Sequence, residues 1–228
     1  MSISHTNSEW TKRLKELCAS NLDVAYANDR VVLITYESRH VERYHMWMSD
    51  DETREMTCSE RLSLEEEHET RASWAAHQYC GTFLIIDAEE FVKSNGSEDE
   101  SLAGDVNFVQ YFDYVELLIM IGDRKFRRRK LADQAVRLMI GHVSAFVNNR
   151  NIQANIRADN KPCIELLKRV GFSVQEDSES STKEDVIMVL NSEEQKRIGN
   201  EIENVLYRND HLIQKLIEGS REYASQFV

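Results

Sequence analysis

The sequence has few cysteines and no closely spaced pair of them. Cys18, Cys58, Cys80 and Cys163 are scattered along 228 residues without a C-x-x-C spacing. Residues 1–5 lack the apolar run that opens a signal peptide. These absences predict reduced thiols in a cytoplasmic protein. Because the sequence has no paired Cys or His spacing, no metal site is expected.

Long hydrophobic runs and an excess of positive charge are also missing. No apolar stretch approaches the ~20 residues that a membrane span needs, so no spanning helix is expected. The chain has 40 Asp and Glu against 28 Lys and Arg, which gives a net charge of -12. Without a bulk positive potential to attract a polyanion, general nucleic-acid binding is not expected. The length suits one full core with additional segments.

One stretch nevertheless concentrates positive charge. Residues 115–121 are typical of a buried strand, residues 131–146 of an amphipathic helix, and six cations fall in residues 124–130 between them. A loop that leads from a strand into a helix is suited to an anion, because the first-turn N–H groups are unpaired and the helix dipole favours negative charge. Cations have the wrong sign for a helix start, so this loop predicts an anionic ligand or partner.

Hydrophobic periodicity divides the rest of the chain into three parts. We expect an amphipathic helical extension over residues 1–28, one domain over 29–191 and a C-terminal helix over 192–228. The domain should be α/β, or α+β, with a mixed and mostly antiparallel sheet. Strands are expected at 31–34, 82–87, 106–110, 115–121, 152–156 and 186–190, and helices at 41–49, 63–79, 131–147 and 160–170. The strands at 115–121 and 152–156 should be parallel, because a helix separates them.

Local signals mark several boundaries. Ser63 and Glu66 form a capping box before a helix, and Asn160 caps a short helix that ends at Gly171. Residues 93–100 are polar and predict a solvated loop. Another capping box, Ser192 with Gln195, opens the C-terminal helix.

The C-terminal helix carries an apolar seam with two possible uses. Its residues alternate four and three apart, which is typical of coiled coils: Ile198, Ile202, Val205, Asn209, Leu212 and Leu216. The seam could form a helix-mediated dimer. It could equally pack back on its own domain, since three heptads are few.

The order of elements from residue 115 onward resembles the GNAT superfamily of N-acetyltransferases. The resemblance includes the run Asn160-x-x-x-Ile164-x-Leu166-Leu167-x-x-x-Gly171-Phe172. Residues 31–34 with Trp47 and residues 104–107 resemble the ribosomal-protein-type enzymes, and the eukaryotic N-acetyltransferase 9-like group is most similar. The resemblance covers about residues 29–191. It implies the GNAT fold, in which helices flank the sheet and two parallel strands splay apart, here with extra N- and C-terminal helices.

The resemblance implies acetyl-CoA as co-substrate. Its pantetheine arm would pair with Ile119, Met120 and Ile121, and an asparagine that contacts the arm corresponds to Asn160. Its pyrophosphate would lie on a loop of the form Arg/Gln-x-x-Gly-x-Gly/Ala, which aligns with Arg127, Arg128, Arg129, Lys130, Leu131 and Ala132.

Two of these positions depart from the family pattern. Arg128 and Lys130 replace glycines, and all eight glycines of the chain lie outside the loop. Long side chains can point away from a phosphate if their backbone is right-handed helical, and their charge can strengthen phosphate binding. The cluster could otherwise be a solvated basic face or a contact site for an acidic protein.

Glu116 is the candidate catalytic base, because it matches a glutamate that is frequent in the ribosomal-type relatives. The alternative is a sheet-end carboxylate in a structural hydrogen bond. The tyrosine that protonates the leaving thiolate in many relatives would fall at Leu167, which cannot do so. Tyr111 and Tyr114 are near Glu116 in sequence without an assigned role.

Three functions follow. The first is acetyl transfer from acetyl-CoA to a protein amine, at an N-terminus or a lysine. The second is a catalytically degenerate GNAT-fold protein that binds an acidic partner such as tubulin, which the resemblance implies because the N-acetyltransferase 9 group is associated with microtubules. The third is CoA binding without transfer.

Overall fold

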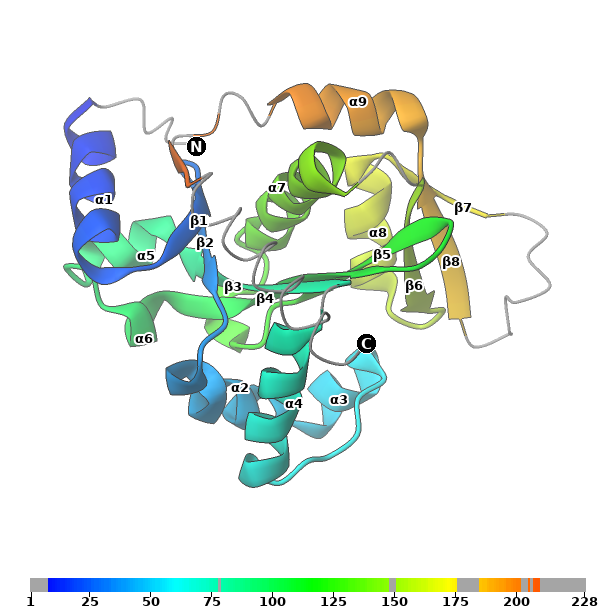
Figure 1. Cartoon of the computed structure of the whole chain (residues 1–228), viewed down its shortest axis with the longest axis horizontal. Coiled ribbons are helices and arrows are strands. Elements are labelled where there is room, and N and C mark those ends of the chain that lie inside the picture. Colours follow the sequence, from blue (N-terminus) through cyan, green and yellow to red (C-terminus); the bar gives the residue numbers. More distant parts are fainter. Residues whose placement is uncertain are drawn as a thin grey trace.

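One mixed sheet runs through the molecule (Figure 1). The computed structural model describes residues 8–77, 79–147, 151–175, 185–201, 205 and 207–209. Within them, nine strands lie in the order β7-β8-β6-β5-β4-β3-β2-β1-β9. Their bounds are β1 Val24–Ala27, β2 Val31–Thr35, β3 Cys80–Asp87, β4 Leu102–Gln110, β5 Tyr114–Met120, β6 Asn151–Arg157, β7 Phe172–Val174, β8 Asp185–Leu190 and β9 Tyr207–Arg208. Only β5 and β6 pair in parallel among the described strands.

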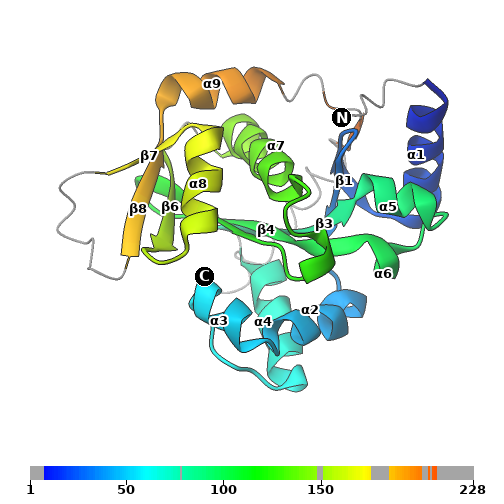
Figure 2. The same ribbon diagram turned by 180° about the vertical axis from the view of Figure 1, so that it is seen from behind.

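Helices cover both faces of this sheet (Figures 1 and 2). One face carries α7 (Leu131–Phe146), α8 (Lys161–Val170) and α9 (Ser192–Glu201). The other carries α2 (Val41–Met48), α3 (Asp51–Thr57) and α4 (Leu64–Ala76). Beside β1 and β2 gather α1 (Ser8–Asn21), α5 (Ala88–Lys93) and α6 (Glu98–Ser101). This arrangement confirms the predicted fold class.

Each face of the sheet has its own hydrophobic core. On β2, Val31 and Leu33 belong to the core under α7, whereas Val32 and Ile34 belong to the core under α1 and α2. Successive strand residues point to opposite faces, so a strand covered on both sides must be apolar throughout. This explains why β2 appears in the sequence as an uninterrupted apolar run.

The predicted helix signals are confirmed in detail. Ser63 Oγ accepts a hydrogen bond from the N–H of Glu66 (3.3 Å), and the Glu66 carboxylate accepts one from the N–H of Ser63 (2.7 Å). At α8, Asn160 Oδ1 accepts from the N–H of Cys163 (3.2 Å), and Gly171 ends the helix with φ of 117°. The helix from Ser63 stops at Ala76, three residues before its expected end.

Two glycines allow close approaches near the end of β5. A Cβ on Gly104 would collide with the carbonyl oxygen of Met120, and a Cβ on Gly122 would collide with the indole of Trp47. Glycine is therefore required at both positions, because no other residue lets backbone or ring come so near.

Several short elements differ from the sequence-based expectation. Residues 93–100, expected as a solvated loop, contain the end of α5 and the start of α6. Asp87 caps α5 and Ser97 caps α6, each through a side-chain oxygen. Strands β1, β7 and β9 and helix α3 were also not expected. Elements of two to seven residues are too short to show a hydrophobic period, which explains these omissions.

The C-terminal segment is not one continuous helix. Helix α9 ends at Glu201, and β9 pairs with β1 and covers its outer edge. The N-terminal cap of α9 is Asn191 and not Ser192, because Asn191 Oδ1 accepts a hydrogen bond from the N–H of Glu193 (2.8 Å). Ile198 is buried in the core under α7, so this part of the seam packs on its own domain. The seam residues Ile202, Leu212 and Leu216 lie outside the described residues, and the dimer stays a prediction.

A buried histidine makes stability depend on pH. His142 of α7 is hydrogen-bonded through Nδ1 to the Tyr26 hydroxyl (2.9 Å) and is surrounded by aromatic rings. Burial, and then the positive Arg208, lower the pKa of His142 to about 4. The unfolded chain therefore takes up a proton first as the pH falls below about 6.5, and stability is lost between about pH 6.5 and about pH 4.

We predict that His142→Phe reduces this pH dependence. Between pH 7 and pH 5 the parent should lose roughly 2 kcal/mol more stability than the variant. Urea unfolding of both proteins at the two pH values measures this difference, and carboxylates common to both proteins cancel. Equal losses in the two proteins would contradict the assignment.

Candidate active site

The parallel strands β5 and β6 separate after three residue pairs. Tyr114, Val115 and Glu116 pair with residues 151–153, and the ladder ends there. Beyond it β6 pairs with β8, and β5 stays paired with β4 as far as Met120. Within the described residues, the β5 edge that faces β6 therefore has no strand partner after Glu116. This confirms the predicted splayed pair, and Ile119, Met120 and Ile121 lie along it.

Glu116 lies at the fork between the two strands. Its carboxylate accepts hydrogen bonds from the hydroxyl of Tyr111 and from the N–H of Asn155 on β6. Burial is the largest influence on this carboxyl group and raises its pKa. Sequence reasoning did not find Tyr111 or Asn155 as partners, because the contact depends on the β4–β5 turn and on the fork.

The loop after β5 has an unusual backbone. A short 3₁₀ helix, η2 (Arg124–Phe126), is followed by Arg128 and Lys130, both with φ of 65°. The right-handed backbone that would let these long side chains point away from a phosphate is not adopted: both residues are left-handed, at a cost of about 1–2 kcal/mol each. They adopt the conformation for which glycine is preferred, at the two positions that align with glycines of the family pattern.

The start of α7 is open to an anion. Its N-cap, Lys130, makes no side-chain capping hydrogen bond, in contrast to Asp50, Ser63 and Asn160 at other helix starts. Asp133 in the first turn is paired with Arg137 (3.1 Å). Unpaired first-turn N–H groups and the helix dipole can then bind a negatively charged ligand. Leu131 can contribute only its backbone, since its side chain is buried in the core.

Acidic residues at the start of α3 neutralise part of the loop. Arg124 contacts Asp50 (3.0 Å) and Glu52 (2.8 Å), and Arg127 lies 3.7 Å from Glu52. These residues are substantially exposed, so each pair contributes little stability by itself. Together they orient the loop against α3.

The remaining loop cations divide into two kinds. Arg129 is held by Asp87 (3.1 Å) at the end of β3, and Lys125 donates to the carbonyl oxygen of Glu100 (2.9 Å). Arg128 and Lys130 are exposed and have no ion pair within the described part of the chain. These two side chains are the ones available to an external anion.

Leu167, where many relatives carry the tyrosine acid, is buried in the core under α7 and offers no proton. Asn160 lies just beyond the end of β6. Its Oδ1 is used to cap α8, which leaves its amide N–H₂ for a ligand.

Within the described residues, no three His, Cys, Asp or Glu side chains gather to hold a metal ion. None of the described helices is long and apolar enough to cross a bilayer.

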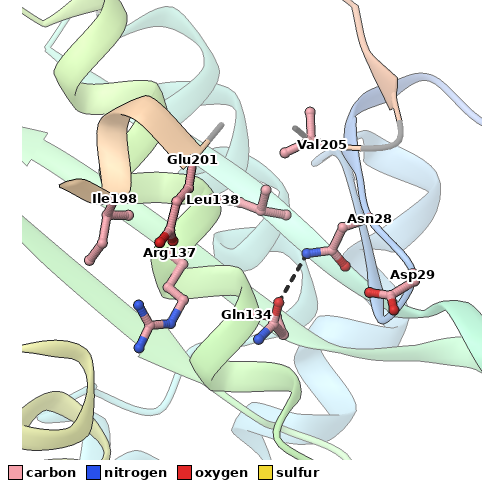
Figure 3. Close-up of a pocket in the computed structure, with 8 residues that line it drawn as sticks. All are labelled: Asn28, Asp29, Gln134, Arg137, Leu138, Ile198, Glu201 and Val205. Atoms are coloured by element: carbon pink, nitrogen blue, oxygen red, sulfur yellow. Dashed lines mark hydrogen bonds between the residues drawn. The ribbon is translucent and has the colours of Figure 1, made fainter. Parts of the chain in front are cut away.

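A cavity of about 210 Å³ lies elsewhere, between α7, α9 and the β1–β2 turn (Figure 3). Asn28 Nδ2 donates to Gln134 Oε1 across it (3.1 Å). No predicted site residue lines this cavity, so it is separate from the fork between β5 and β6.

Comparison with known proteins agrees with this geometry. A family model described as the acetyltransferase (GNAT) domain matches residues 30–173. The chain belongs to the GNAT acetyltransferase family. This GNAT chain is 33% identical over 165 residues to an N-acetyltransferase 9-like protein of Nematostella vectensis, covering 70% of this chain and 82% of the relative. It is 31% identical over 158 residues to alpha/beta-tubulin-N-acetyltransferase 9 of Homo sapiens, covering 67% and 76%.

A solved structure shows the same fold. Spermidine N-acetyltransferase from Vibrio cholerae, in complex with CoA and spermine, superposes on this GNAT chain with a TM-score of 0.59. The sequence identity is 16%, and the match covers 74% of this chain and 99% of the other.

The left-handed residues of the GNAT loop give a stability prediction. Arg128→Gly with Lys130→Gly should stabilise the fold by about 1 kcal/mol, because relief of the left-handed penalty exceeds the entropy that glycine adds to the unfolded chain. Arg127→Gly is the matched control, since Arg127 has φ of -61° and should lose stability on substitution. Urea unfolding measures both. A destabilised double variant would contradict the backbone assignment.

Proposed function

We propose that this chain transfers an acetyl group from acetyl-CoA to an amine of a protein. The observation that carries the proposal is the β5 edge that has no strand partner after Glu116 among the described residues, followed by a loop into the uncapped start of α7. An extended ligand can hydrogen-bond to the free edge of a strand, and a phosphate can bind at the helix start next to it. Acetyl-CoA joins these two features in one molecule.

Each candidate residue then has a defined contribution. The backbone of Ile119, Met120 and Ile121 pairs with the pantetheine arm, and the amide of Asn160 contacts the arm from the β6 side. The loop from Arg127 to Ala132 holds the pyrophosphate through main-chain N–H groups. The left-handed backbone at Arg128 and Lys130 supports this fit, because it gives the main chain the path that glycine would allow. The charges of both side chains then add salt bridges to phosphate.

Glu116 acts as the base. The neutral amine attacks the thioester carbonyl, the C–S bond breaks, and CoA leaves as its thiolate. The nitrogen loses a proton as the amide bond forms, and a carboxylate of raised pKa at the fork is suited to take it. The hydrogen bonds from Tyr111 and Asn155 hold the carboxylate in place.

The acceptor that we propose is tubulin. The support is the similarity to the human alpha/beta-tubulin-N-acetyltransferase 9. The cytoplasm is the proposed compartment, and the four unpaired cysteines suit its reducing conditions.

Acetyl-CoA binding and turnover test this function together. Acetyl-CoA at 100 times its Kd should stabilise the parent by about 2.7 kcal/mol, measured as a rise in Tm. Purified tubulin with labelled acetyl-CoA should become acetylated. Glu116→Gln should lower kcat roughly 100-fold or more while acetyl-CoA binding is retained.

Asp113→Asn is the matched control for Glu116→Gln. It removes an exposed carboxylate from the neighbouring turn and should leave kcat within about twofold. No change in Tm at millimolar acetyl-CoA would eliminate the proposal. Undiminished kcat in Glu116→Gln would remove Glu116 from it.

Engagement of an acidic protein surface is a second candidate, favoured by the exposed Arg128 and Lys130 without ion pairs in the described structure. Charge reversal by Arg128→Glu with Lys130→Glu should weaken microtubule binding and reduce its dependence on salt. Cosedimentation at two salt concentrations measures this. Lys168→Glu on α8 serves as control, and equal binding by the loop variant and the parent would exclude the loop.

A further inference from the structure

The sheet face opposite α7 carries a row of polar residues beside the free edge of β5. Asn107 of β4 is the Cα partner of Leu118 on β5 and of Thr82 on β3. Tyr36 directly follows β2 and extends this row. Two residues before Asn107 on β4, Asp105 is the partner of Met120 on β5. Residues two apart on a strand share a face, so Asp105, Asn107 and Glu116 all point toward α2 and α4.

Three polar atoms in this row are buried or partly buried without a partner. Asp105 is 2% exposed and Tyr36 is 7% exposed. Asn107 Nδ2 donates to Asp105 Oδ2 (2.7 Å), which leaves Asp105 Oδ1 and Asn107 Oδ1 as acceptors. Neither these two oxygens nor the Tyr36 hydroxyl has a hydrogen bond within the described residues. Buried polar atoms are costly to leave unpaired, so three acceptor oxygens along one row of the sheet favour a ligand that donates hydrogen bonds.

The charge around these atoms favours a cation. Burial, and then the charges of Glu67 and Asp105, raise the pKa of Tyr36, so both carboxylates lie within electrostatic reach of its hydroxyl. Arg71 of α4 acts on the same hydroxyl in the opposite direction, and His45 of α2 lies 3.9 Å from Glu67.

Burial raises the pKa of Asp105 to about 7. A neighbouring positive charge favours the ionised carboxylate, so a bound cation would offset the burial of Asp105.

This row is open at the side where the thioester would lie. Leu118 is 41% exposed and Asn107 is partly exposed, whereas Asp105 lies below them. Glu116 is two residues from Leu118 on the same face, about 7 Å along the strand. A nitrogen over Leu118 would thus lie between Asn107 and Glu116.

We propose that Asp105, Asn107 and Tyr36 bind the acceptor amine as a primary ammonium group. An ammonium has three N–H donors, and the row offers three acceptor oxygens, one of which belongs to the Asp105 carboxylate. The role of this site as an acceptor site rests on the proposed acetyl transfer. The Asp105 carboxylate supplies the charge, while the Asn107 and Tyr36 oxygens fix the direction of the nitrogen.

A simple amine tests the site without turnover. n-Propylammonium chloride should bind the parent in calorimetric titrations with and without excess CoA, and n-propanol should not. Asp105→Asn should weaken this binding roughly 30-fold or more, and Tyr36→Phe about fivefold. Tyr26→Phe is the matched control, because it removes a buried hydroxyl on the opposite face of the sheet. It should bind the amine as the parent does.

The results separate the two proposals. Failure of CoA to bind would count against acetyl transfer, whereas amine binding that depends on Asp105 would still support the ammonium site. No binding of the amine to the parent, or equal affinity in Asp105→Asn, would overturn the site.

Two acceptor peptides distinguish the source of the amine. One has a free N-terminus and no lysine, and the other has a blocked N-terminus and one lysine. In acetylation assays Asp105→Asn should raise KM for the preferred peptide roughly tenfold or more and change kcat less. A kcat loss with unchanged KM would contradict the binding role.

Discussion

The end of the β5–β6 ladder at Glu116 is the constraint from which the rest of the site follows. Because β4 holds β5 along its whole length, β5 keeps its direction while β6 turns away with β8. A strand that is paired on only one side presents unpaired backbone groups on the other. Residues of β5 belong to the cores on both faces of the sheet, and α7 begins after the loop that follows this strand.

Opposite charges lie on the two sides of β5. Toward the start of α7 the chain offers N–H groups, Arg128 and Lys130, whereas the face under α2 and α4 offers Asp105 and Glu67. The chain's own carboxylates meanwhile occupy Arg124 and Arg129. An anionic donor and a cationic acceptor would therefore each approach the same strand through an environment of opposite charge to its own. The division fits the chemistry proposed for this fold.

Much of the fold could be predicted because its long elements show clear periods. Strand β5, helix α7 and the caps at Ser63 and Asn160 are where the pattern placed them. The two-residue β9 and the four-residue β1 are too short for a pattern, and the apolar seam predicted a helix where β9 lies.

The candidate site was harder to predict than the fold. The resemblance drew attention to Glu116, but its contact with Asn155 depends on where two strands part. Residues 104–107 belonged to the resemblance, but the row that Asp105 and Asn107 of β4 form with Tyr36 could not be predicted, because it depends on the register of β2, β3 and β4. The left-handed backbone at Arg128 also escaped notice, since nothing in an arginine side chain signals its φ.

The backbone at Arg128 and Lys130 shows that conformation and residue type can differ, although a sequence motif treats them as one property. In this loop an arginine and a lysine adopt a φ that favours glycine. A search pattern that requires glycine letters rejects the loop, whereas a pattern that asks for left-handed φ at these two positions accepts it. A backbone criterion can therefore find a loop of this shape where a residue pattern cannot.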